Sequence, residues 1–195
     1  MPKITWKGGA LLAPVPAAMV TCSHQGRENV LTIAWTGIIN SNPPKTYISV
    51  RPGRFSYEMI KESRAFVINL PSRALVRAAD YCGVKSGRDV DKLAELSLKT
   101  EPSPNLGCPM LCDCPVSIEC RVFEVKPLGS HDMFMADILS VSVDDRYIDE
   151  AGKFRLDKAD VVGFAHGSYY TLGSFLGNLG YSVMKKKTAK RKRKK

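Results

Sequence analysis

The alternation of hydrophobic and polar residues predicts a chain built mainly of β-strands. Four short stretches have the β-branched and aromatic composition of strands, at residues 17–23, 29–36, 46–50 and 65–70. Two longer strands are predicted at residues 116–126 and 133–144, with a turn over residues 129–132. In the first long strand, Val116, Ile118, Cys120 and Val122 alternate with Ser117, Glu119 and Arg121. This alternation predicts one buried face and one face in water.

Three short helices are predicted between the strands. The first covers residues 56–62, with Ser56 as its N-cap. The second begins at Ser72 and stops at Gly83, and its apolar residues Leu75, Val76, Ala79 and Cys82 recur at helical spacing. The third covers residues 89–96, with Leu93 and Leu96 facing inward. Two stretches rich in proline, residues 40–44 and 100–115, are predicted as loops.

These elements favour one antiparallel β-barrel with a few short helices over its ends. Closing a sheet into a barrel removes its exposed edges. The strands do not alternate regularly with helices, which disfavours a doubly wound parallel sheet. A chain of 195 residues suits a single core. We expect the folded domain to span residues 1–184.

The net charge of +10 is concentrated at the C-terminus. Residues 185–195 hold nine Lys and Arg and no acid, and the rest of the chain holds 20 basic and 19 acidic residues. A dense block of like charge repels itself, so we expect a disordered tail. Such a tail binds polyanions weakly through their phosphates, and no specific nucleic-acid site is expected.

We expect a cytoplasmic protein, because the sequence contains neither a membrane span nor a secretory signal. No run of 18 apolar residues occurs, so no membrane span is expected. The first residues lack the apolar core and cleavage site of a secretory signal.

Six cysteines leave a metal site as an alternative. Disulfides are not expected in a reducing compartment. Cys108, Cys112 and Cys114 are close in sequence, but no CxxC pair occurs, and the three histidines lie far from them. Buried thiols are the favoured interpretation, and a zinc or redox site at these three cysteines is the alternative.

Two turns combine basic residues with a hydroxyl, as an anion site requires. Neither a GxxxxGK[ST] loop nor a strand followed by GxGxxG is present, and no hydrolase motif occurs. Residues 49–56 leave a strand and enter a helix, and they contain two arginines, Arg51 and Arg54, and the hydroxyl of Ser56. A helix N-terminus with an arginine favours a phosphate. Residues 85–92 contain Ser86, Gly87, Arg88 and Lys92. A plain helix cap and a plain polar turn are the alternatives.

Two aromatic residues are candidates for contact with a flat ring. Trp35 ends a strand, where an indole can pack against an aromatic ligand, although a core tryptophan is the alternative. His131 lies in a turn and is either simply exposed or placed to meet such a ring.

Three stretches, taken in order, resemble the flavin reductase-like domain family and most closely its flavoredoxins. The first runs from Asn29 through Trp35 to Pro44 and continues to Pro71; the second is residues 82–92; the third is residues 129–134. Their order and spacing match over residues 10–182, and the basic tail lies outside the match.

The resemblance implies a split β-barrel that binds flavin mononucleotide (FMN), usually as a homodimer. The positions that it implies for FMN binding are Asn29, Ala34, Trp35, Thr36, Ser49, Val50, Arg51, Phe55, Ser56, Ser86, Lys92, His131 and Phe164. We expect Arg51, Ser56, Ser86 and Lys92 nearest the phosphate, and Trp35, Thr36, His131 and Phe164 nearer the ring. No separate catalytic acid or base is expected, because the flavin supplies the redox chemistry.

The resemblance allows two activities. The first is an NAD(P)H-dependent flavin reductase with bound FMN. The second is a flavoredoxin-type electron-transfer protein that is reduced by a protein partner. The sequence does not distinguish NADH, NADPH or a redox protein as the electron donor.

Overall fold

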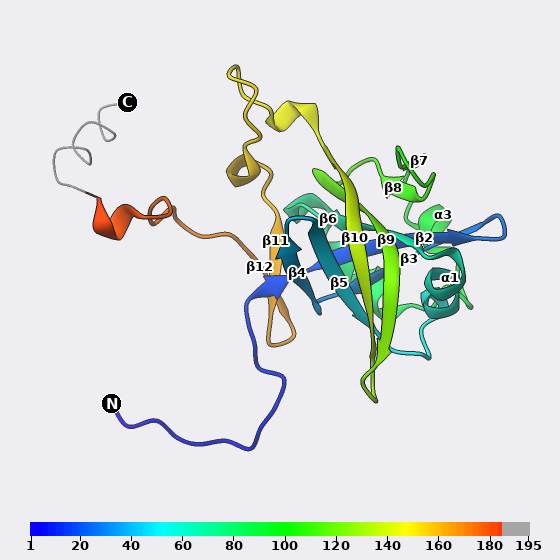
Figure 1. The fold of residues 1–195 in the computed structure, drawn as a ribbon, viewed down its shortest axis with the longest axis horizontal. Coiled ribbons are helices and arrows are strands. Elements are labelled where there is room, and N and C mark those ends of the chain that lie inside the picture. Colours follow the sequence, from blue (N-terminus) through cyan, green and yellow to red (C-terminus); the bar gives the residue numbers. More distant parts are fainter. Residues whose placement is uncertain (185–195) are drawn as a thin grey trace.

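A computed structural model describes residues 1–184 of the chain. Its main sheet has seven antiparallel strands in the order β3-β2-β6-β9-β10-β5-β4 (Figure 1). Their bounds are β2 Ala18–His24, β3 Arg27–Ile33, β4 Thr36–Ser41, β5 Pro44–Val50, β6 Ala65–Leu70, β9 Val116–Pro127 and β10 Asp132–Val143. Two smaller sheets pair β1 (Val15–Pro16), β11 (Val162–Ala165) and β12 (Ser168–Thr171), and β7 (Thr100–Pro102) with β8 (Pro109–Leu111). The mainly β, antiparallel fold is confirmed.

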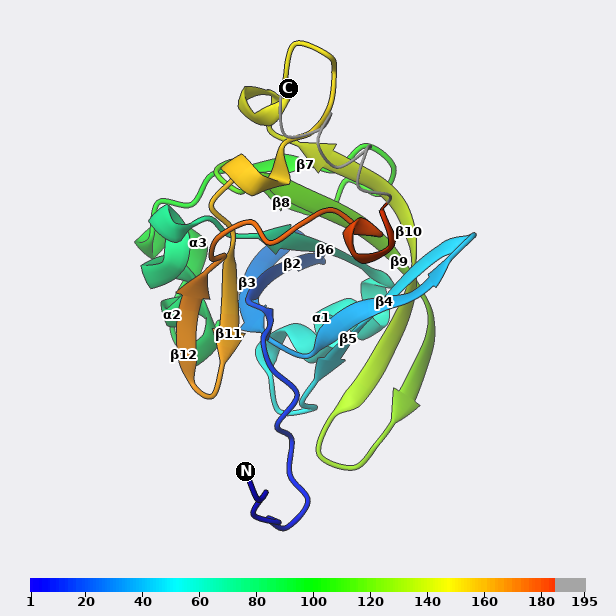
Figure 2. The ribbon, with the colours of Figure 1, turned by 90° about the vertical axis from the view of Figure 1, so that its left-hand side faces the viewer.

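The main sheet curls until its two sides meet, as the end-on view in Figure 2 shows. Strands β3 and β5 contact each other there without forming a hydrogen-bonded ladder. The barrel is therefore split along this side. On this side, the bond from Ser49 N to the carbonyl of Trp35 (2.9 Å) extends the β4–β5 pairing by one residue beyond Thr36.

The helices cover the sheet on two sides. Helix α1 (Phe55–Ser63) closes one end of the barrel and adds Tyr57, Met59 and Ile60 to a core that contains Phe66 and Phe134. Helices α2 (Val76–Val84) and α3 (Lys92–Glu95) lie against β3. Short 3₁₀ helices are η1 Arg73–Leu75, η2 Asp145–Tyr147, η3 Leu156–Lys158 and η4 Tyr181–Val183.

The predicted inward faces of the second and third helices are confirmed. Ala79 and Cys82 are buried beside Leu75, Leu93 and Leu96 in one cluster. The third helix is shorter than predicted, because Asp91 caps it by accepting from the N–H groups of the two residues after Lys92 (3.1 Å each). A cap at that position fixes the first turn of the helix.

Both predicted loops were wrong in part. Residues 40–44 form the tip of the β4–β5 hairpin, where Pro44 begins β5. A proline is compatible with that place because it is the first residue of its strand. Residues 100–115 contain the short pair β7 and β8, which packs Met110 and Leu111 into the interior. The strand predicted over residues 29–36 is shorter at its end than expected, since β3 ends at Ile33 and the next strand, β4, begins at Thr36.

The expectation of a solvated face on β9 was wrong for Ser117 and Glu119. Ser117 is 5% exposed and Glu119 is fully buried, whereas Arg121 is exposed. The segment over residues 103–111 folds across this face, and its Asn105 donates to the Glu119 carboxylate from both N and Nδ2. The N–H of Leu106 adds a third donor (2.7 Å). Glu119 therefore anchors the covering segment to the sheet.

We predict that Glu119→Gln lowers the free energy of unfolding by about 2 kcal/mol, because hydrogen bonds to a charged acceptor contribute about 1.5–3 kcal/mol. Burial alone raises the pKa of Glu119, but the donors of Asn105, Ser103, Ser140 and Leu106 outweigh it and hold the pKa at about 2. The folded-state pKa is thus below the ordinary value of 4.5, so this stabilisation is present above pH 4.5 and is lost as pH falls toward 2. Urea unfolding at pH 7 and between pH 4.5 and 2 measures both effects.

The control for this experiment is Glu124→Gln, an exposed carboxylate on the same strand. It should leave stability and its acid dependence unchanged. Equal losses in both variants would contradict the anchoring role of Glu119.

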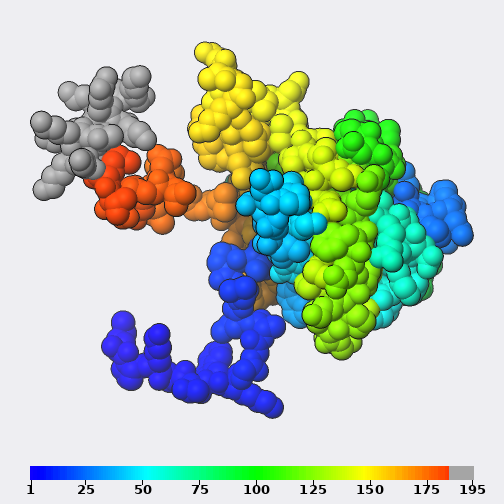
Figure 3. Space-filling view, in the orientation of Figure 1, coloured from blue at the N-terminus to red at the C-terminus, as the bar shows by residue number. Residues whose placement is uncertain are grey.

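The terminal segments project from the barrel (Figure 3). They expose large apolar side chains, among them Trp6 at 75% and Phe175 at 79%. The predicted basic tail, residues 185–195, lies outside the described residues. Over residues 1–184, no helix combines the length and apolar character needed to cross a membrane.

Candidate functional site

Three of the four expected phosphate-binding positions, all but Arg51, line one hollow together with Asn29, and we call this hollow the anion pocket. It has a volume of about 180 Å³, and Asn29, Ser56, Ser86 and Lys92 line it. Its rim also includes Gly53, Arg54, Phe55, Lys85, Gly87 and Arg88. The two basic turns of the sequence therefore come together on one small space.

Ser56 contributes to this pocket from inside the first turn of α1. The prediction that it caps the helix was wrong: Arg54 is the N-cap residue and makes no side-chain cap bond. Ser56 is 1% exposed, and its Oγ accepts a hydrogen bond from Nδ2 of Asn29 on β3 (2.6 Å). The Ser56 hydroxyl lines the pocket beside the thiol of Cys22. The N–H groups of a first helical turn lack partners within the helix.

Lys92 brings a buried cation to the same pocket. It is 3% exposed, and its Nζ donates to the carbonyls of Cys82 and Lys85 (3.2 Å each). An ammonium has three N–H donors, so one remains. Among the described residues, no carboxylate forms an ion pair with Lys92. The Lys92 ammonium therefore has no negatively charged partner among these residues.

Neighbouring thiols do not supply that negative charge. Burial raises the pKa of Cys22 to about 12 and the pKa of Cys82 to about 11, so both are protonated at neutral pH. Burial also lowers the pKa of Lys92 from its ordinary value. A bound anion would reverse that shift, because it favours the charged form.

Gly87 allows the second turn to approach the pocket wall closely. A Cβ at this position would lie 2.6 Å from Cδ1 of Phe55 and closer still to Oδ1 of Asn29. Contacts this short do not occur between real side chains, so only glycine fits here without movement. The wall of the pocket therefore depends on a residue without a Cβ at position 87.

A second hollow lies at the split of the barrel, and we call it the ring hollow. Ala34, Trp35, Thr36 and Ser49 line it together with residues 9–12, and its volume is about 360 Å³. Phe164 lines an adjoining space of about 230 Å³ with Ala34 and Trp35. Trp35 is 44% exposed, so the alternative of a core tryptophan is excluded.

His131 and Arg51 join Trp35 at this hollow. The rings of Trp35 and His131 lie 4.4 Å apart between centroids, tilted by 44°. Nε of Arg51 donates to Nε2 of His131 (3.4 Å), and Oγ of Ser130 lies 3.0 Å from Nδ1. Burial, Arg51 and Arg54 all lower the pKa of His131, so the imidazole is neutral at pH 7 and Arg51 carries the charge.

The two hollows are joined by one segment of chain. Residues 49–56 begin with Ser49 at the ring hollow, pass Arg51 beside His131, and reach Arg54 and Ser56 at the anion pocket. Val50, between them, points its side chain into the core and offers only its backbone to a ligand. The structure therefore places Arg51 nearer the ring residues and Arg54 nearer the phosphate residues.

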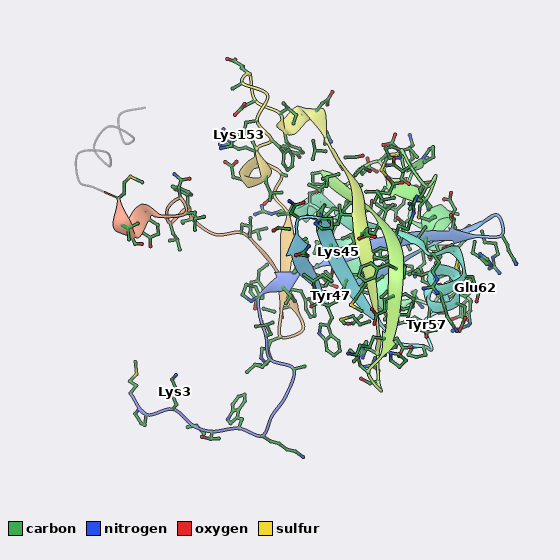
Figure 4. All side chains as sticks on the ribbon, viewed as in Figure 1. Lys3, Lys45, Tyr47, Tyr57, Glu62 and Lys153 are labelled. Atoms are coloured by element: carbon green, nitrogen blue, oxygen red, sulfur yellow. The ribbon has the colours of Figure 1, made fainter. Side chains whose placement is uncertain are left out.

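A buried hydrogen bond between α1 and β10 links the anion pocket to the ring hollow. The hydroxyl of Tyr57 on α1 donates to Oδ2 of Asp132 on β10 (2.6 Å), and Figure 4 shows Tyr57 beside the end of that strand. This bond raises the pKa of Tyr57 to about 12. Each partner directly follows a site residue, Ser56 or His131, so the bond connects the anion pocket to the ring hollow.

Residues 9–12 were missed by the sequence reasoning, and Arg54 was part of the candidate anion turn but not of the positions that the resemblance implies for FMN binding. Arg54 borders the anion pocket because the helix begins at Phe55. Residues 9–12 approach the ring hollow from a segment without regular secondary structure, and no local pattern signals such an approach.

Comparison with known proteins decides the family. The model of the flavin reductase-like domain matches residues 11–173. The chain belongs to the flavin reductase-like domain family. This domain is 32% identical to the flavoredoxin of Desulfovibrio vulgaris (Miyazaki F), with a TM-score of 0.86, over 94% of this chain and 100% of that one. The flavoredoxin of Methanosarcina acetivorans has the same TM-score and coverage at 27% identity. An NADPH-flavin oxidoreductase of Streptomyces viridifaciens is 24% identical over 65% of each chain.

The cysteines of this flavin reductase-like chain do not converge. Cys108 and Cys114 pack into different apolar clusters, and Cys112 is exposed. The other three cysteines are buried, so the interpretation as buried thiols is confirmed for five of the six. Within residues 1–184, no group of three or more His, Cys, Asp or Glu side chains is arranged to hold a metal ion.

Proposed function

We propose that the chain is an FMN-dependent oxidoreductase of the flavin reductase type. The observation that carries this proposal is the anion pocket, where a buried ammonium without a carboxylate partner in residues 1–184 meets two serine hydroxyls and an asparagine. Such a pocket fits one phosphate monoester. The aromatic ring hollow lies at the other end of residues 49–56, as a molecule with a phosphate and a flat ring requires.

The residues fit FMN in a defined order. Lys92, Ser56, Ser86 and the first turn of α1 would hold the phosphate, with Asn29 orienting the hydroxyl of Ser56. Trp35 and Phe164 would pack against the ring, and backbone groups of Thr36, Ser49 and Val50 would meet its polar edge. Arg51 would supply positive charge at the ring edge, since His131 is neutral.

When bound, FMN supplies the two-electron redox chemistry, and the protein's part is to bind, orient and tune it. NADH or NADPH is the proposed electron donor. The alternative is a flavoredoxin-type protein that is reduced by a protein partner, and the similarity to two flavoredoxins along nearly the whole chain supports it as the second candidate.

Anaerobic mixing with each nicotinamide tests the donor. The FMN-loaded protein should lose its flavin absorbance at about 450 nm when NADH or NADPH is added. No loss with either nicotinamide would reject the reductase and leave the electron-transfer alternative.

We predict that Arg51→Ala weakens FMN binding about tenfold, because a charge-assisted contact contributes about 1.5–3 kcal/mol. Titration of the apoprotein with FMN, followed by quenching of flavin fluorescence, gives the dissociation constant. The exposed Arg121 on β9 lines neither hollow and supplies the control Arg121→Ala. An unchanged dissociation constant for Arg51→Ala would remove this residue from the site.

The proposed assembly is a cytoplasmic homodimer. Exposed apolar residues of the terminal segments, such as Trp6, Leu12, Phe175 and Leu176, support it, since monomers rarely expose so many. Free thiols fit a reducing compartment. Light scattering during gel filtration tests the dimer, and a monomer mass would reject it.

We also propose that residues 1–184 suffice for binding, so truncation of residues 185–195 should leave FMN affinity unchanged.

A further inference from the structure

A further hollow lies between the β11–β12 hairpin and α2, and we call it the hairpin hollow. Figure 2 shows the hairpin beside α2 at this edge of the barrel. Its volume is about 280 Å³, and most of its lining is apolar or aromatic. Its polar side chains are those of Thr32, Asp80 and Tyr169, and no lysine, arginine or histidine is among its lining residues. The hollow therefore offers hydrogen-bonding groups and one carboxylate but no cation.

Asp80 is the charged group of the hairpin hollow. The hydroxyl of Tyr169 donates to Oδ1 of Asp80 (3.2 Å). Burial and the nearby Asp80 raise the pKa of Tyr169 to about 12, so this phenol keeps its proton at neutral pH. Among the described residues, no lysine or arginine forms an ion pair with Asp80. A carboxylate accepts about four hydrogen bonds, so Asp80 has acceptor positions left for a ligand.

Thr32 adds a hydroxyl that has no partner of its own. Its Oγ1 is buried and forms no hydrogen bond within residues 1–184. A buried hydroxyl without a partner costs free energy. A ligand that carries hydroxyl groups would donate to Asp80 and bring polar partners to this side of β3.

The hairpin hollow reaches the ring hollow through one intermediate space. Ala34, Phe164 and Gly167 line both the hairpin hollow and the space of about 230 Å³ beside it. That space in turn shares Ala34 and Trp35 with the ring hollow, and it contains the imidazole of His166. A long ligand with one end at the ring hollow can therefore place its other end in the hairpin hollow.

We propose that the hairpin hollow binds the adenosine end of the nicotinamide donor and that Asp80 makes the protein selective for NADH over NADPH. This inference rests on the proposed function, because it requires a nicotinamide that delivers electrons at the ring hollow. Phe164 and Tyr169 offer aromatic surface to an adenine. The two hydroxyls of the adenosine ribose donate hydrogen bonds, which the free acceptor positions of Asp80 suit.

The same carboxylate disfavours NADPH. NADPH carries a phosphate in place of the 2′-hydroxyl of this ribose, and recognition of that phosphate normally uses an arginine. The lining of the hairpin hollow contains no cation, so the phosphate would meet the like charge of Asp80. The hollow thus accepts a neutral diol and rejects its phosphate ester.

The test measures binding of NAD⁺ and NADP⁺ to the FMN-loaded protein by calorimetry, together with anaerobic reduction by NADH and NADPH. The wild type should bind NAD⁺ at least about tenfold more tightly than NADP⁺. Asp80→Asn keeps the shape of the side chain and removes its charge. It should lose about tenfold in NAD⁺ affinity and gain affinity for NADP⁺. The limiting rate of reduction by NADH should stay unchanged, because Asp80 lines neither the ring hollow nor the anion pocket.

Two variants serve as controls. Tyr169→Phe removes the phenol but keeps the carboxylate of Asp80, so it should keep the preference for NAD⁺. Glu62 is an exposed carboxylate on α1, labelled in Figure 4, and it lines none of these spaces. Glu62→Gln should change neither affinity.

The outcomes separate this inference from the proposed function. A wild type that binds NADP⁺ as tightly as NAD⁺, or equal changes for both nucleotides in Asp80→Asn, would overturn the role of Asp80 and leave the proposed function standing. A protein that binds FMN but neither nucleotide would also overturn it and would favour reduction by a protein partner. A protein that binds no FMN would overturn the proposed function and this inference together.

Discussion

Replacing Gly87 by alanine should weaken FMN binding about a hundredfold. The added Cβ would lie 2.6 Å from Cδ1 of Phe55 and closer to Oδ1 of Asn29, so one of the two side chains or the turn itself must move. Overpacking of this kind costs about 1–3 kcal/mol, and 1.4 kcal/mol is a factor of ten in affinity. Asn29 orients the hydroxyl of Ser56, so its displacement also disturbs a phosphate donor. Fluorescence titration with FMN measures the effect.

Gly53 provides a matched control on the rim of the same pocket. A Cβ at Gly53 meets nothing within 4 Å, and the residue lines the anion pocket as Gly87 does. Gly53→Ala should therefore keep the affinity of the wild type. If Gly87→Ala bound FMN normally while remaining folded by circular dichroism, the close approach of residues 85–88 would have no role in binding.

Lys92→Met should also lower FMN affinity about a hundredfold, but with little change in the stability of the apoprotein. The substitution removes the buried cation of the anion pocket and keeps an unbranched apolar side chain of similar length. A charge-assisted contact to phosphate contributes about 1.5–3 kcal/mol. In the free protein, the lost bonds to the carbonyls of Cys82 and Lys85 are offset because no charge has to be buried. The wild-type affinity should fall with salt more steeply than that of the variant.

Lys61→Met is the control for charge alone. Lys61 is an exposed lysine on α1 that pairs with Glu58 at 3.7 Å. It should bind FMN as the wild type does. Thermal unfolding of the apoproteins separates the two roles of Lys92: a variant that loses stability and affinity together would mark Lys92 as a structural residue.

The strands were predictable because their composition and their burial agree. Residues 65–70 form β6 as predicted, since a β-branched run suits a strand that is buried on both faces. Glu119 shows where local pattern fails. A period of two predicts its direction, but only the distant segment over residues 103–111 decides that this direction is covered.

The sequence predicted which residues form the site, but it did not predict how they are arranged. Asn29, Ser56, Ser86 and Lys92 meet as the family resemblance implied. The sequence reasoning began the helix at Ser56, whereas it begins at Phe55 with Arg54 as its N-cap. Arg54 therefore stands at the helix N-terminus beside the pocket, whereas Arg51, three residues earlier, lies beside His131. The approach of Gly87 to Phe55 joins segments 32 residues apart and has no local signature.

The central claim is that the anion pocket holds the phosphate of a flavin. The most direct measurement compares the dissociation constants of FMN and riboflavin, which differ only by that phosphate, on the wild-type apoprotein. The account predicts one FMN per chain and binding of riboflavin weaker by about a hundredfold, since the pocket brings an ammonium and two hydroxyls to the phosphate. Equal affinities for FMN and riboflavin, or no binding of FMN, would contradict it.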